Sequence, residues 1–330
     1  MSKVYLVKDA KSIQYEQVLE RELRERFKSG MIVAVKLHMG EDKGMFSPEL
    51  ARRAVAVLNK LGCKPFLFDT PVTYHGHRHT KQDYEKIAPV HGFSKEKIGC
   101  PVIISDSYTT IKTKNMSVEV SKELANADAF LVLTHVKGHP CSGVGGAIKN
   151  LGMGCVSQKS KADQHGMVEP VADDNCTACG ICEEVCPFNA IKIDEKAVVN
   201  NDACGGCTNC VYNCPNNAMT SKLTFDILLS EAAGAVLKAV ENKPVFYVND
   251  VRSITKNCDC FSNPGSPIAK DVGITLSDDL VAIEMASTDA IINQEKRNVF
   301  EEVHHHDPYI HIKEAEKLGF GNGEYDLALL

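Results

Sequence analysis

The sequence predicts an α/β protein in which a mostly parallel, doubly wound sheet is interrupted by an inserted cysteine-rich segment. Two observations predict this fold. Apolar, β-branched runs alternate with segments of helical period on both sides of residues 169–221, and such alternation favours a parallel sheet. The intervening segment carries eight of the 14 cysteines in a duplicated pattern. We therefore expect a discontinuous α/β domain, residues 1–168 and 222–330, with a second domain inserted at 169–221.

Before the cysteine-rich segment, the sequence alternates between helical and apolar runs. The helical segment 15–28 carries alternating charges and stops just before Gly30, a common helix terminator. Further helices are expected at 48–62 and 118–128. The short apolar runs that we predict as strands are 31–37, 64–70, 101–107 and 129–138.

After the cysteine-rich segment the same alternation resumes. The polar loops 71–86 and 257–271 each follow a predicted strand. Ligands of open parallel sheets bind at the carboxyl ends of strands, so we expect these loops to border a functional site. The elements expected in this part are helices at 230–242 and 278–293 and strands at 244–250 and 272–276.

The composition limits the classes of function. A hydrophobic content of 44% supports an ordinary buried core. Trp is absent and only 6% of the residues are aromatic, which gives no support to a nucleic-acid-binding platform. Residues 169–215 contain eight acidic residues and two lysines, so the formal net charge of −6 arises there. An acidic face suits a basic patch on a redox partner protein, although solubility explains it equally well.

No membrane segment is predicted. The N-terminal stretch MSKVYLVKDAKS lacks the apolar region of a signal peptide, and no later run approaches about 18 uninterrupted apolar residues. We expect a cytoplasmic protein, because thiols stay reduced there and clustered cysteines usually bind metal.

Two runs of cysteines share the spacing C-x₂-C-x₂-C-x₃-C-P, which is typical of 4Fe–4S clusters. This spacing allows a tight loop to bring three thiolates to three corners of one cubane, with backbone N–H groups facing the sulfurs. Zinc is the alternative, because CxxC pairs also form zinc sites, but zinc does not usually need the third cysteine or the duplicated Cys-Pro. The runs are Cys176, Cys179, Cys182 and Cys186, followed by Cys204, Cys207, Cys210 and Cys214.

The segment resembles the two-cluster bacterial ferredoxins, which have an α+β fold. The resemblance includes the pairs Ala190-Ile191 and Ala218-Met219 that follow the two runs. It implies that the fourth cysteine of each run binds the other cluster. It therefore assigns one 4Fe–4S cluster to Cys176, Cys179, Cys182 and Cys214, and a second to Cys204, Cys207, Cys210 and Cys186.

The stretch THVKGHPCSGVGGAIKNLGMG, residues 134–154, is the second informative region. His135 ends a predicted strand, and Lys137, His139 and Cys141 follow it. Glycines then open an expected helix whose N-terminus can seat an anion, with Lys149 adding positive charge. Neither a P-loop nor a dinucleotide fingerprint is present. The residues of this expected anion- or substrate-binding loop are Gly143, Gly145, Gly146 and Asn150.

Cys258 and Cys260 form a C-x-C pair in a polar loop after the predicted strand 244–250. Such a pair can offer two thiolates to a metal ion or to a third iron–sulfur site. The alternative is a pair of unliganded loop thiols, because two ligands alone do not complete a site. The other cysteines that precede or follow predicted elements are expected to be small buried apolar residues, namely Cys63, Cys100 and Cys155.

A second resemblance extends over nearly the whole chain. The stretches KLHMGE, KPFLFDT, THVKGH with GGAIKNLGMGC, NCDCF and GFGNGEYDL are similar to an uncharacterised iron–sulfur-centre protein family. In that family, found chiefly in anaerobes, a domain of unknown function carries an inserted two-cluster ferredoxin. The resemblance supports the discontinuous architecture and a cytoplasmic location, and it assigns no reaction. It marks as site positions His38, Asp69, Tyr74, His135, Lys137, His139, Lys149, Asn150, His165, Cys258, Cys260 and Asp279.

Three features need a separate interpretation. Asp279 is not followed by the proline that the family commonly has, so a helix cap is the alternative to a functional role. His75, His77 and His79 fall outside the family pattern and are expected to be solvated. The histidine-rich stretch 303–311 is interpreted as a loop, with metal binding as the less favoured interpretation.

Two hypotheses of function follow from these observations. The favoured one is an oxidoreductase whose clusters exchange single electrons with a small anionic substrate, or with a third metal centre, in the α/β crevice. Lys and His side chains there hold the anion or move protons. The alternative is a non-catalytic electron carrier or delivery protein whose α/β domain docks a partner enzyme. The residues expected to carry the favoured reaction are His38, His135, Lys137 and Lys149.

Overall fold

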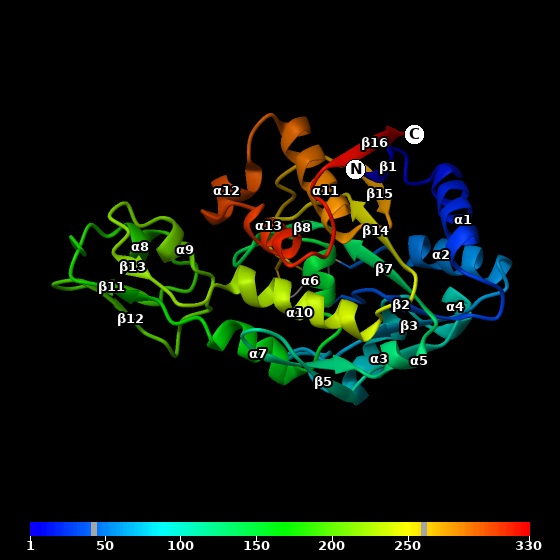
Figure 1. The fold of residues 1–330 in the computed structure, drawn as a ribbon, viewed down its shortest axis with the longest axis horizontal. Coiled ribbons are helices and arrows are strands. Elements are labelled where there is room, and N and C mark those ends of the chain that lie inside the picture. The colour runs from blue at the N-terminus through cyan, green and yellow to red at the C-terminus, as the bar shows by residue number, and fades with distance from the viewer. Residues whose placement is uncertain (41–44, 259–262) are drawn as a thin grey trace.

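The computed structural model describes residues 1–40, 45–258 and 263–330. Within these ranges eight strands form one sheet, which crosses the middle of the molecule (Figure 1). In sheet order the strands are β16 (Tyr325–Leu329), β1 (Ser2–Val7), β15 (Gly273–Ser277), β14 (Val245–Val251), β7 (Ala129–His135), β2 (Ile32–Lys36), β3 (Lys64–Asp69) and β4 (Val102–Ile104).

Most neighbouring strands of this sheet run parallel, as predicted. The strands from β14 through β7, β2 and β3 to β4 are parallel in succession, and β16 is parallel to β1. In contrast, β15 runs antiparallel to both β14 and β1. No helix lies in the described chain between β14 and β15, and parallel neighbours need a long crossover connection, usually a helix. The sheet is therefore mixed, although mostly parallel.

Helices cover both faces of the sheet (Figure 1). Outside the cysteine-rich segment the helices are α1 (Gln14–Arg26), α2 (Pro48–Lys60), α3 (Lys81–Val90), α4 (Lys95–Ile98), α5 (Glu123–Asn126), α6 (Ala147–Gly152), α7 (Gln158–Gly166), α10 (Phe225–Ala239), α11 (Leu280–Glu295), α12 (Val299–His304) and α13 (Ile310–Lys317). Successive strand residues point to opposite faces. Val33 and Val35 accordingly pack in a core with α1 and α2, whereas Ala34 packs in another with α6 and α10.

The sequence explains why α2 and α10 begin where they do. Ser47 caps α2 by accepting a hydrogen bond from the backbone N–H of Leu50, and Pro48 occupies the first turn. Thr224 caps α10 in the same way. The residues of α10 are apolar on nearly every side, and most of them are buried. An all-round apolar helix requires cover on all sides, which α6 and α13 help to provide.

The helix predicted at 118–128 is mostly wrong. Residues Ser117–Ser121 form strand β6, which pairs antiparallel with β5 (Tyr108–Lys112). Val118 and Val120 are buried while Glu119 between them is partly exposed. That alternation has the period of a strand, and only the short α5 that follows is helical.

The loop predicted at 71–86 contains the start of α3. Thr80 caps this helix by accepting a hydrogen bond from the backbone N–H of Asp83, a start signal that precedes the helix in the sequence. His75 and His77 are exposed and His79 is partly exposed, in agreement with the predicted solvated histidines.

The histidine-rich stretch 303–311 is a loop only at residues 305–309, and helices occupy its two ends. Helix α12 ends at His304 and α13 begins at Ile310. His304, His306 and His311 are all buried, with exposed fractions of 5%, 1% and 0%. Their burial was not predicted, because the polar partners that allow these rings to be buried lie far away in the sequence.

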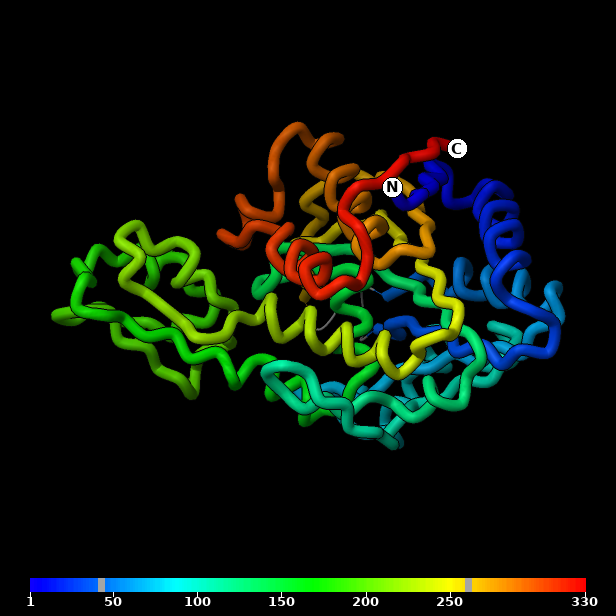
Figure 2. The backbone as a smooth tube through the Cα atoms, viewed as in Figure 1, coloured from blue at the N-terminus to red at the C-terminus, as the bar shows by residue number. Residues whose placement is uncertain are grey.

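The cysteine segment, residues 169–221, extends from one end of the molecule (Figures 1 and 2). It follows α7 and leads into α10. Because β10 pairs antiparallel with β13, the chain enters and leaves the segment at adjacent positions (Figure 2). Its elements are β10 (Val171–Ala172), α8 (Ile181–Glu184), β11 (Ile191–Ile193), β12 (Ala197–Val199), α9 (Asn209–Tyr212) and β13 (Met219–Thr220).

Candidate functional site

A cavity of about 250 Å³ lies at the carboxyl ends of three neighbouring strands. Lys36 is the last residue of β2, Asp69 of β3 and His135 of β7, and all three line the cavity. The carboxyl ends of parallel strands meet at one edge of a sheet, where open α/β sheets bind their ligands. The topology thus brings these distant side chains together.

Most residues that the sequence marks as functional line this cavity. They include every side chain expected to carry the favoured reaction. The marked residues in the lining are His38, Asp69, Tyr74, His135, Lys137, His139, Gly145, Gly146, Lys149, Asn150, His165 and Cys258.

Three marked positions have a different outcome. Gly143 belongs to β9 (Gly143–Gly145), which pairs with β8 (Lys137–His139), and it is not among the described residues that line the cavity. Asp279 caps α11, since its Oδ1 accepts from two amides of the first turn, each at 2.9 Å. Cys260 lies outside the described residues, while its neighbour Cys258 is buried.

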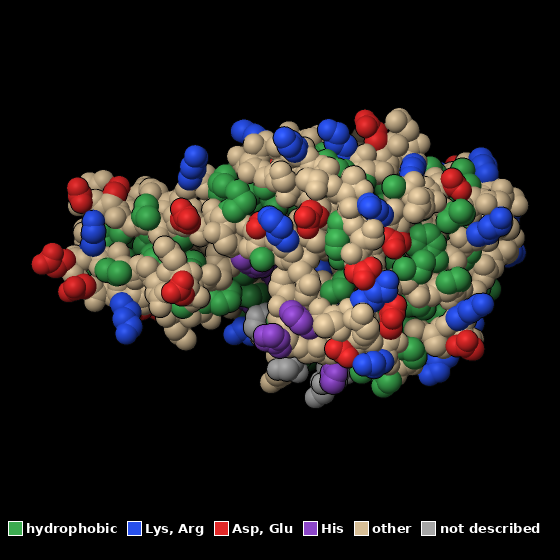
Figure 3. All heavy atoms as spheres, turned by 90° about the horizontal axis from the view of Figure 1, so that it is seen from below, with side chains coloured by type: hydrophobic (Ala, Val, Ile, Leu, Met, Phe, Trp, Pro, Cys, Tyr) green, Lys and Arg blue, Asp and Glu red, His purple; other side chains and the backbone are tan. Residues whose placement is uncertain are grey.

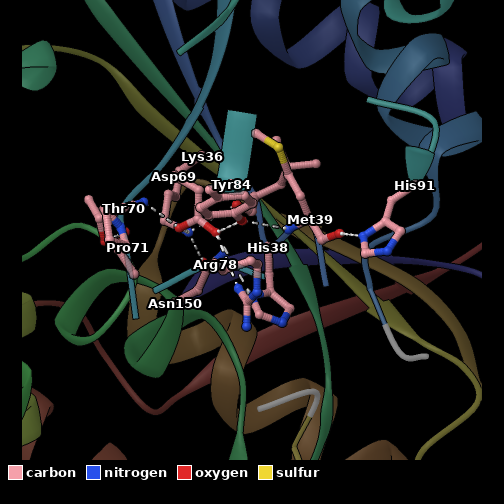
Figure 4. A network of polar contacts seen from close by, with 12 residues as sticks. Lys36, His38, Met39, Asp69, Thr70, Pro71, Arg78, Tyr84, His91 and Asn150 are labelled. Atoms are coloured by element: carbon pink, nitrogen blue, oxygen red, sulfur yellow. Dashed lines mark hydrogen bonds and ion pairs between the residues drawn. The ribbon is translucent and has the colours of Figure 1, made fainter. Parts of the chain in front are cut away.

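Asp69 is the centre of a buried polar network at the cavity (Figure 4). Its Oδ1 lies 3.0 Å from Lys36 Nζ, and Tyr84 OH donates a hydrogen bond to its Oδ2. The fully buried Arg78 lies 3.8 Å from the same carboxylate and 3.0 Å from His38 Nδ1. Burial, together with the charge of Asp69, raises the pKa of Tyr84. The phenol therefore stays protonated and keeps donating to the carboxylate.

Asn150 orients Lys36 within this network. Its Oδ1 accepts from Lys36 Nζ at 2.7 Å, while its Nδ2 donates to the backbone oxygen of Leu133 and to Thr134 Oγ1 at 2.9 and 3.0 Å. The oxygen and the nitrogen of the Asn150 side chain thus both form hydrogen bonds within the protein. This gives Asn150 a positioning role, which differs from the anion-binding role suggested by the sequence.

Lys161 is a cavity residue that the sequence analysis missed. Its Nζ donates to Thr70 Oγ1 at 2.7 Å and to the backbone oxygen of Pro71. Burial lowers the pKa of Lys161 to about 7, although the carboxylate of Asp69 opposes the shift. An amine with a pKa near neutrality can accept and release protons. Because α7 is polar along its length, nothing in its pattern distinguished Lys161.

Among the described residues, basic side chains outnumber acidic ones in the lining of the cavity. Five lysine or arginine side chains line it, against one carboxylate among the described residues. In a partly enclosed, low-dielectric site such an excess attracts anions. The five cations are Lys36, Arg78, Lys137, Lys149 and Lys161, and the carboxylate is that of Asp69.

The N-terminus of α6 is not the anion-binding seat predicted from its glycines. The backbone N–H of Ala147 donates to Glu284 Oε2 at 2.6 Å, so a carboxylate of α11 already occupies this position. A Cβ on Gly146 would overlap that carboxylate. The glycine is therefore required for the close approach of Glu284.

The second cysteine repeat contacts the wall of the cavity. Phe188 of the cysteine segment is part of the lining. The backbone oxygen of Gly205, inside the second repeat, accepts from His165 Nδ1 at 2.8 Å and lies 3.8 Å from Cys141 Sγ. Both His165 and Cys141 line the cavity. Burial raises the pKa of the Cys141 thiol, which favours the protonated form that donates to Gly205.

Four cysteines from the two repeats surround one small pocket. They are Cys176, Cys179 and Cys182 of the first repeat and Cys214 of the second. This is the grouping that the resemblance to ferredoxins implies. Backbone amides donate to the sulfurs of Cys176 and Cys214 at 3.5 and 3.4 Å, as is common around cluster ligands.

The other four cysteines also lie near one another. Burial raises the pKa of Cys207 to about 12, and the nearby thiols of Cys210, Cys186 and Cys204 add to this shift. Backbone amides donate to the sulfurs of Cys186 and Cys204 at 3.3 and 3.4 Å. This is the second group that the resemblance implies.

The two repeats share an unusual backbone conformation. Three residues in and just after the first run of cysteines have a positive φ, and the residue 28 positions after each of them also has a positive φ. Non-glycine residues adopt this left-handed conformation at an energetic cost. The cost is largest for β-branched Thr208, with φ 61°. The two loops therefore share their local backbone geometry. The pairs are Ala178 and Gly206, Gly180 and Thr208, and Asn189 and Asn217.

The arrangement of the first four cysteines fits a cubane. A single zinc ion takes all its thiolates at about 2.3 Å. A cubane binds each thiolate at a different iron, so its ligands surround a pocket, as these four do.

The chain belongs to the family described as "Domain of unknown function (DUF362)", which it matches over residues 33–289. The matched range includes the central strands that end at the cavity and the whole cysteine segment. The family description names no reaction.

The chain is also similar in part to three other proteins. An uncharacterized protein of Methanocaldococcus jannaschii is 50% identical over 36 residues, which are 11% of this chain and 17% of that protein. A crystal structure of a Thermotoga maritima protein aligns with a TM-score of 0.47 and 10% identity, covering 86% of this chain and 59% of that one. Lactate racemase apoprotein from Thermoanaerobacterium thermosaccharolyticum aligns with a TM-score of 0.38 and 13% identity, covering 76% and 50%. In the described parts of the chain, no helix is long and apolar enough to span a membrane.

Proposed function

We propose that this protein is an iron–sulfur oxidoreductase that acts on a small anionic substrate in the α/β cavity. In this proposal, residues 169–221 form a ferredoxin-like domain inserted into a discontinuous α/β domain. When bound, two 4Fe–4S clusters supply single electrons beside the cavity. The residues that would hold them are Cys176, Cys179, Cys182 and Cys214 for the first cluster, and Cys204, Cys207, Cys210 and Cys186 for the second.

The observation that carries the proposal is the shared wall between the second cysteine repeat and the cavity. Gly205 of the second repeat contacts two cavity residues, His165 and Cys141, and Phe188, which follows the first repeat, lies in the lining. A carrier that only docks a partner enzyme has no need for a cation-lined cavity at this position. The shared wall therefore favours an enzyme over the carrier hypothesis.

The residues of the cavity supply binding and proton transfer. Lysine and arginine side chains attract and orient an anion, such as a carboxylate or phosphate. Lys161, with a pKa near 7, exchanges a proton with the bound molecule. The Asp69 network holds Lys36 and Arg78 in fixed positions, so their charges are preorganised around the substrate. A third metal centre, with Cys258 as one ligand, is a variant of this proposal.

The proposal also includes a redox partner protein. Acidic side chains are spread over the outer end of the cysteine segment (Figure 3), where the sequence has eight acidic residues and two lysines between 169 and 215. Such a face attracts a basic patch and increases the rate of encounter. A cytoplasmic location fits cysteines that must stay reduced.

The test is an anaerobic preparation of the full chain. We expect about eight iron and eight acid-labile sulfide per chain, together with a paramagnetic signal after reduction. Zinc without sulfide would refute the proposal. The enzyme and carrier hypotheses are then separated by titration with inorganic phosphate, a simple anion. Phosphate should bind to the wild type and to Lys159→Met, a control at an exposed lysine, and bind at least about 10-fold more weakly to Lys161→Met. Clusters without any anion binding would favour the carrier.

A further inference from the structure

A buried series of acidic and imidazole side chains extends from the cysteine segment to the wall of the cavity. It consists of His306, Asp226, His311 and Glu284, and we name it the acid–imidazole chain. None of the four is more than 1% exposed. They come from three helices, α10, α11 and α13, and from the connection between α12 and α13. Four parts of the sequence thus converge on one buried, ionisable group of residues.

At the end near the cysteine segment, one proton is shared between His306 and Asp226. Asn209, in the second repeat, uses its Nδ2 to donate to the backbone oxygen of His304 at 2.7 Å. Its Oδ1 therefore faces His306 Nδ1, 2.8 Å away, and that nitrogen must donate. His306 Nε2 lies 3.2 Å from Asp226 Oδ1. A proton must lie between these two atoms, on either the ring or the carboxyl group. Tyr212, which is exposed, donates to the other oxygen of Asp226 at 3.0 Å.

At the other end, His311 stands between two carboxylates. Its Nδ1 lies 4.0 Å from Asp226 Oδ1, and its Nε2 lies 3.6 Å from Glu284 Oε1. Among the described residues, neither ring nitrogen nor this glutamate oxygen has a hydrogen-bond partner. The second oxygen of Glu284 binds the amide of Ala147, directly against Gly146 in the cavity lining.

We propose that the acid–imidazole chain conducts protons between the His306–Asp226 pair and Glu284 at the cavity wall, with His311 as the carrier. The inference rests on the proposed function, because it supplies the proton that accompanies each electron. Two buried carboxylates are costly unless a positive charge or a proton lies between them, and His311 faces both. A movement of about 1 Å brings either ring nitrogen to hydrogen-bond distance.

The transfer conserves atoms and charge. The proton shared by Asp226 and His306 moves to Nδ1 of His311, forming an N–H bond there as the earlier bond breaks. The N–H bond at Nε2 then breaks as an O–H bond forms on Glu284, beside the cavity. Once Glu284 has released this proton toward the cavity, a proton from solvent restores the first pair, and a half-turn of the His311 ring returns its N–H bond to the side of Glu284. The ionisable groups facing His311 are Asp226 of α10 and Glu284 of α11, and His139 of β8 lies within electrostatic range.

The test is a redox titration of the cluster-containing full chain from about pH 5 to 8. We expect the midpoint potential of at least one cluster to fall with pH, at a slope of about one proton per electron. His311→Gln and Glu284→Gln should reduce that slope by at least about half. The matched control is His91→Gln, which alters a partly buried ring bound to the backbone oxygen of Met39 at 2.9 Å, outside the acid–imidazole chain. This control should keep the wild-type slope.

Each outcome bears on a separate claim. Clusters whose potentials do not change with pH in the wild type would overturn the proton path and leave the proposed function intact. Absence of iron and sulfide would overturn both. A purely structural role predicts a lower melting temperature with an unchanged slope, so an unchanged slope in folded His311→Gln also contradicts the path. If His311→Gln fails to fold, the nearly isosteric variants Glu284→Gln and Asp226→Asn replace it. A slope of midpoint potential against pH that stays at the wild-type value in these variants would contradict the path.

Discussion

At the scale of single residues, the partners of a buried cation decide its chemistry. Lys36 has a carboxylate 3.0 Å from its Nζ, which compensates its charge. Lys161 instead donates to a hydroxyl and a backbone oxygen, those of Thr70 and Pro71. Neutral acceptors compensate a buried charge less well than a carboxylate. Burial with these neutral acceptors lowers the pKa of Lys161 to about 7.

Lys161 should therefore make stability depend on pH in the alkaline range. Its pKa is about 7 in the folded state and 10.5 in the reference state, so between these values the unfolded chain binds more protons. The free energy of unfolding contributed by this residue must then rise with pH. Relative to Lys161→Met, the wild type should gain about 2 kcal/mol between about pH 7 and 9. Denaturant titrations at both pH values measure the difference.

The control for this experiment lies on the same helix. Lys159 is exposed and pairs with Asp163, so Lys159→Met should change stability equally at both pH values. If the wild type and Lys161→Met differ in free energy of unfolding by the same amount at both pH values, the pKa of Lys161 is not lowered in the folded protein.

At the scale of elements, α6 is positioned by its contact with α11. Gly146 precedes α6, and the carboxylate of Glu284 lies against it. Neighbouring Gly145 has more room, since a Cβ there would meet the flexible side chain of Lys149 at 3.1 Å. Neither glycine has a positive φ, so added volume is the main difference between them.

This contrast predicts different results for two alanine substitutions. Gly146→Ala should lower the free energy of unfolding by about 1–3 kcal/mol, because the new methyl group displaces Glu284 from the amide of Ala147. Gly145→Ala should cost less than about 1 kcal/mol, because Lys149 can move aside. Denaturant titrations of both variants provide the measurement. Equal losses would contradict the role given to the Glu284 contact.

The elements also show what could be predicted from the sequence. Strands β2, β3 and β7 were found because buried parallel strands are continuous apolar runs, and their last residues pointed to the cavity. The charged Lys36 at the end of an apolar run was an available signal that we overlooked. Arg78 carried no such signal, since it stands in a polar loop and its burial involves residues distant in the sequence, such as His38. The burial of His311 depends likewise on Asp226 and Glu284, which a periodic pattern cannot pair with it.

At the scale of the whole molecule, the two cysteine groups stand in different relations to the cavity. The pocket of the first group is lined entirely by residues of the cysteine segment. The second repeat touches the cavity wall through Gly205. Electrostatic interaction weakens with distance. Charge added to the second cysteine group should therefore change the electrostatic potential in the cavity more than charge added to the first group.

This arrangement predicts that anion binding and reduction oppose each other. An added electron places negative charge beside the cavity, so inorganic phosphate should bind the reduced protein at least about 5-fold more weakly than the oxidised protein. Linkage is reciprocal, so saturating phosphate should lower the midpoint potential of one cluster and change the other much less. Anaerobic calorimetry measures the change in phosphate affinity, and redox titration independently measures the change in midpoint potential.

The Lys161→Met variant has a weakened anion site, so it should lose the change in affinity and the change in potential. The control Lys159→Met alters an exposed lysine and should keep both changes. Equal phosphate affinity in the two redox states would mean that the second repeat and the cavity are not electrostatically coupled.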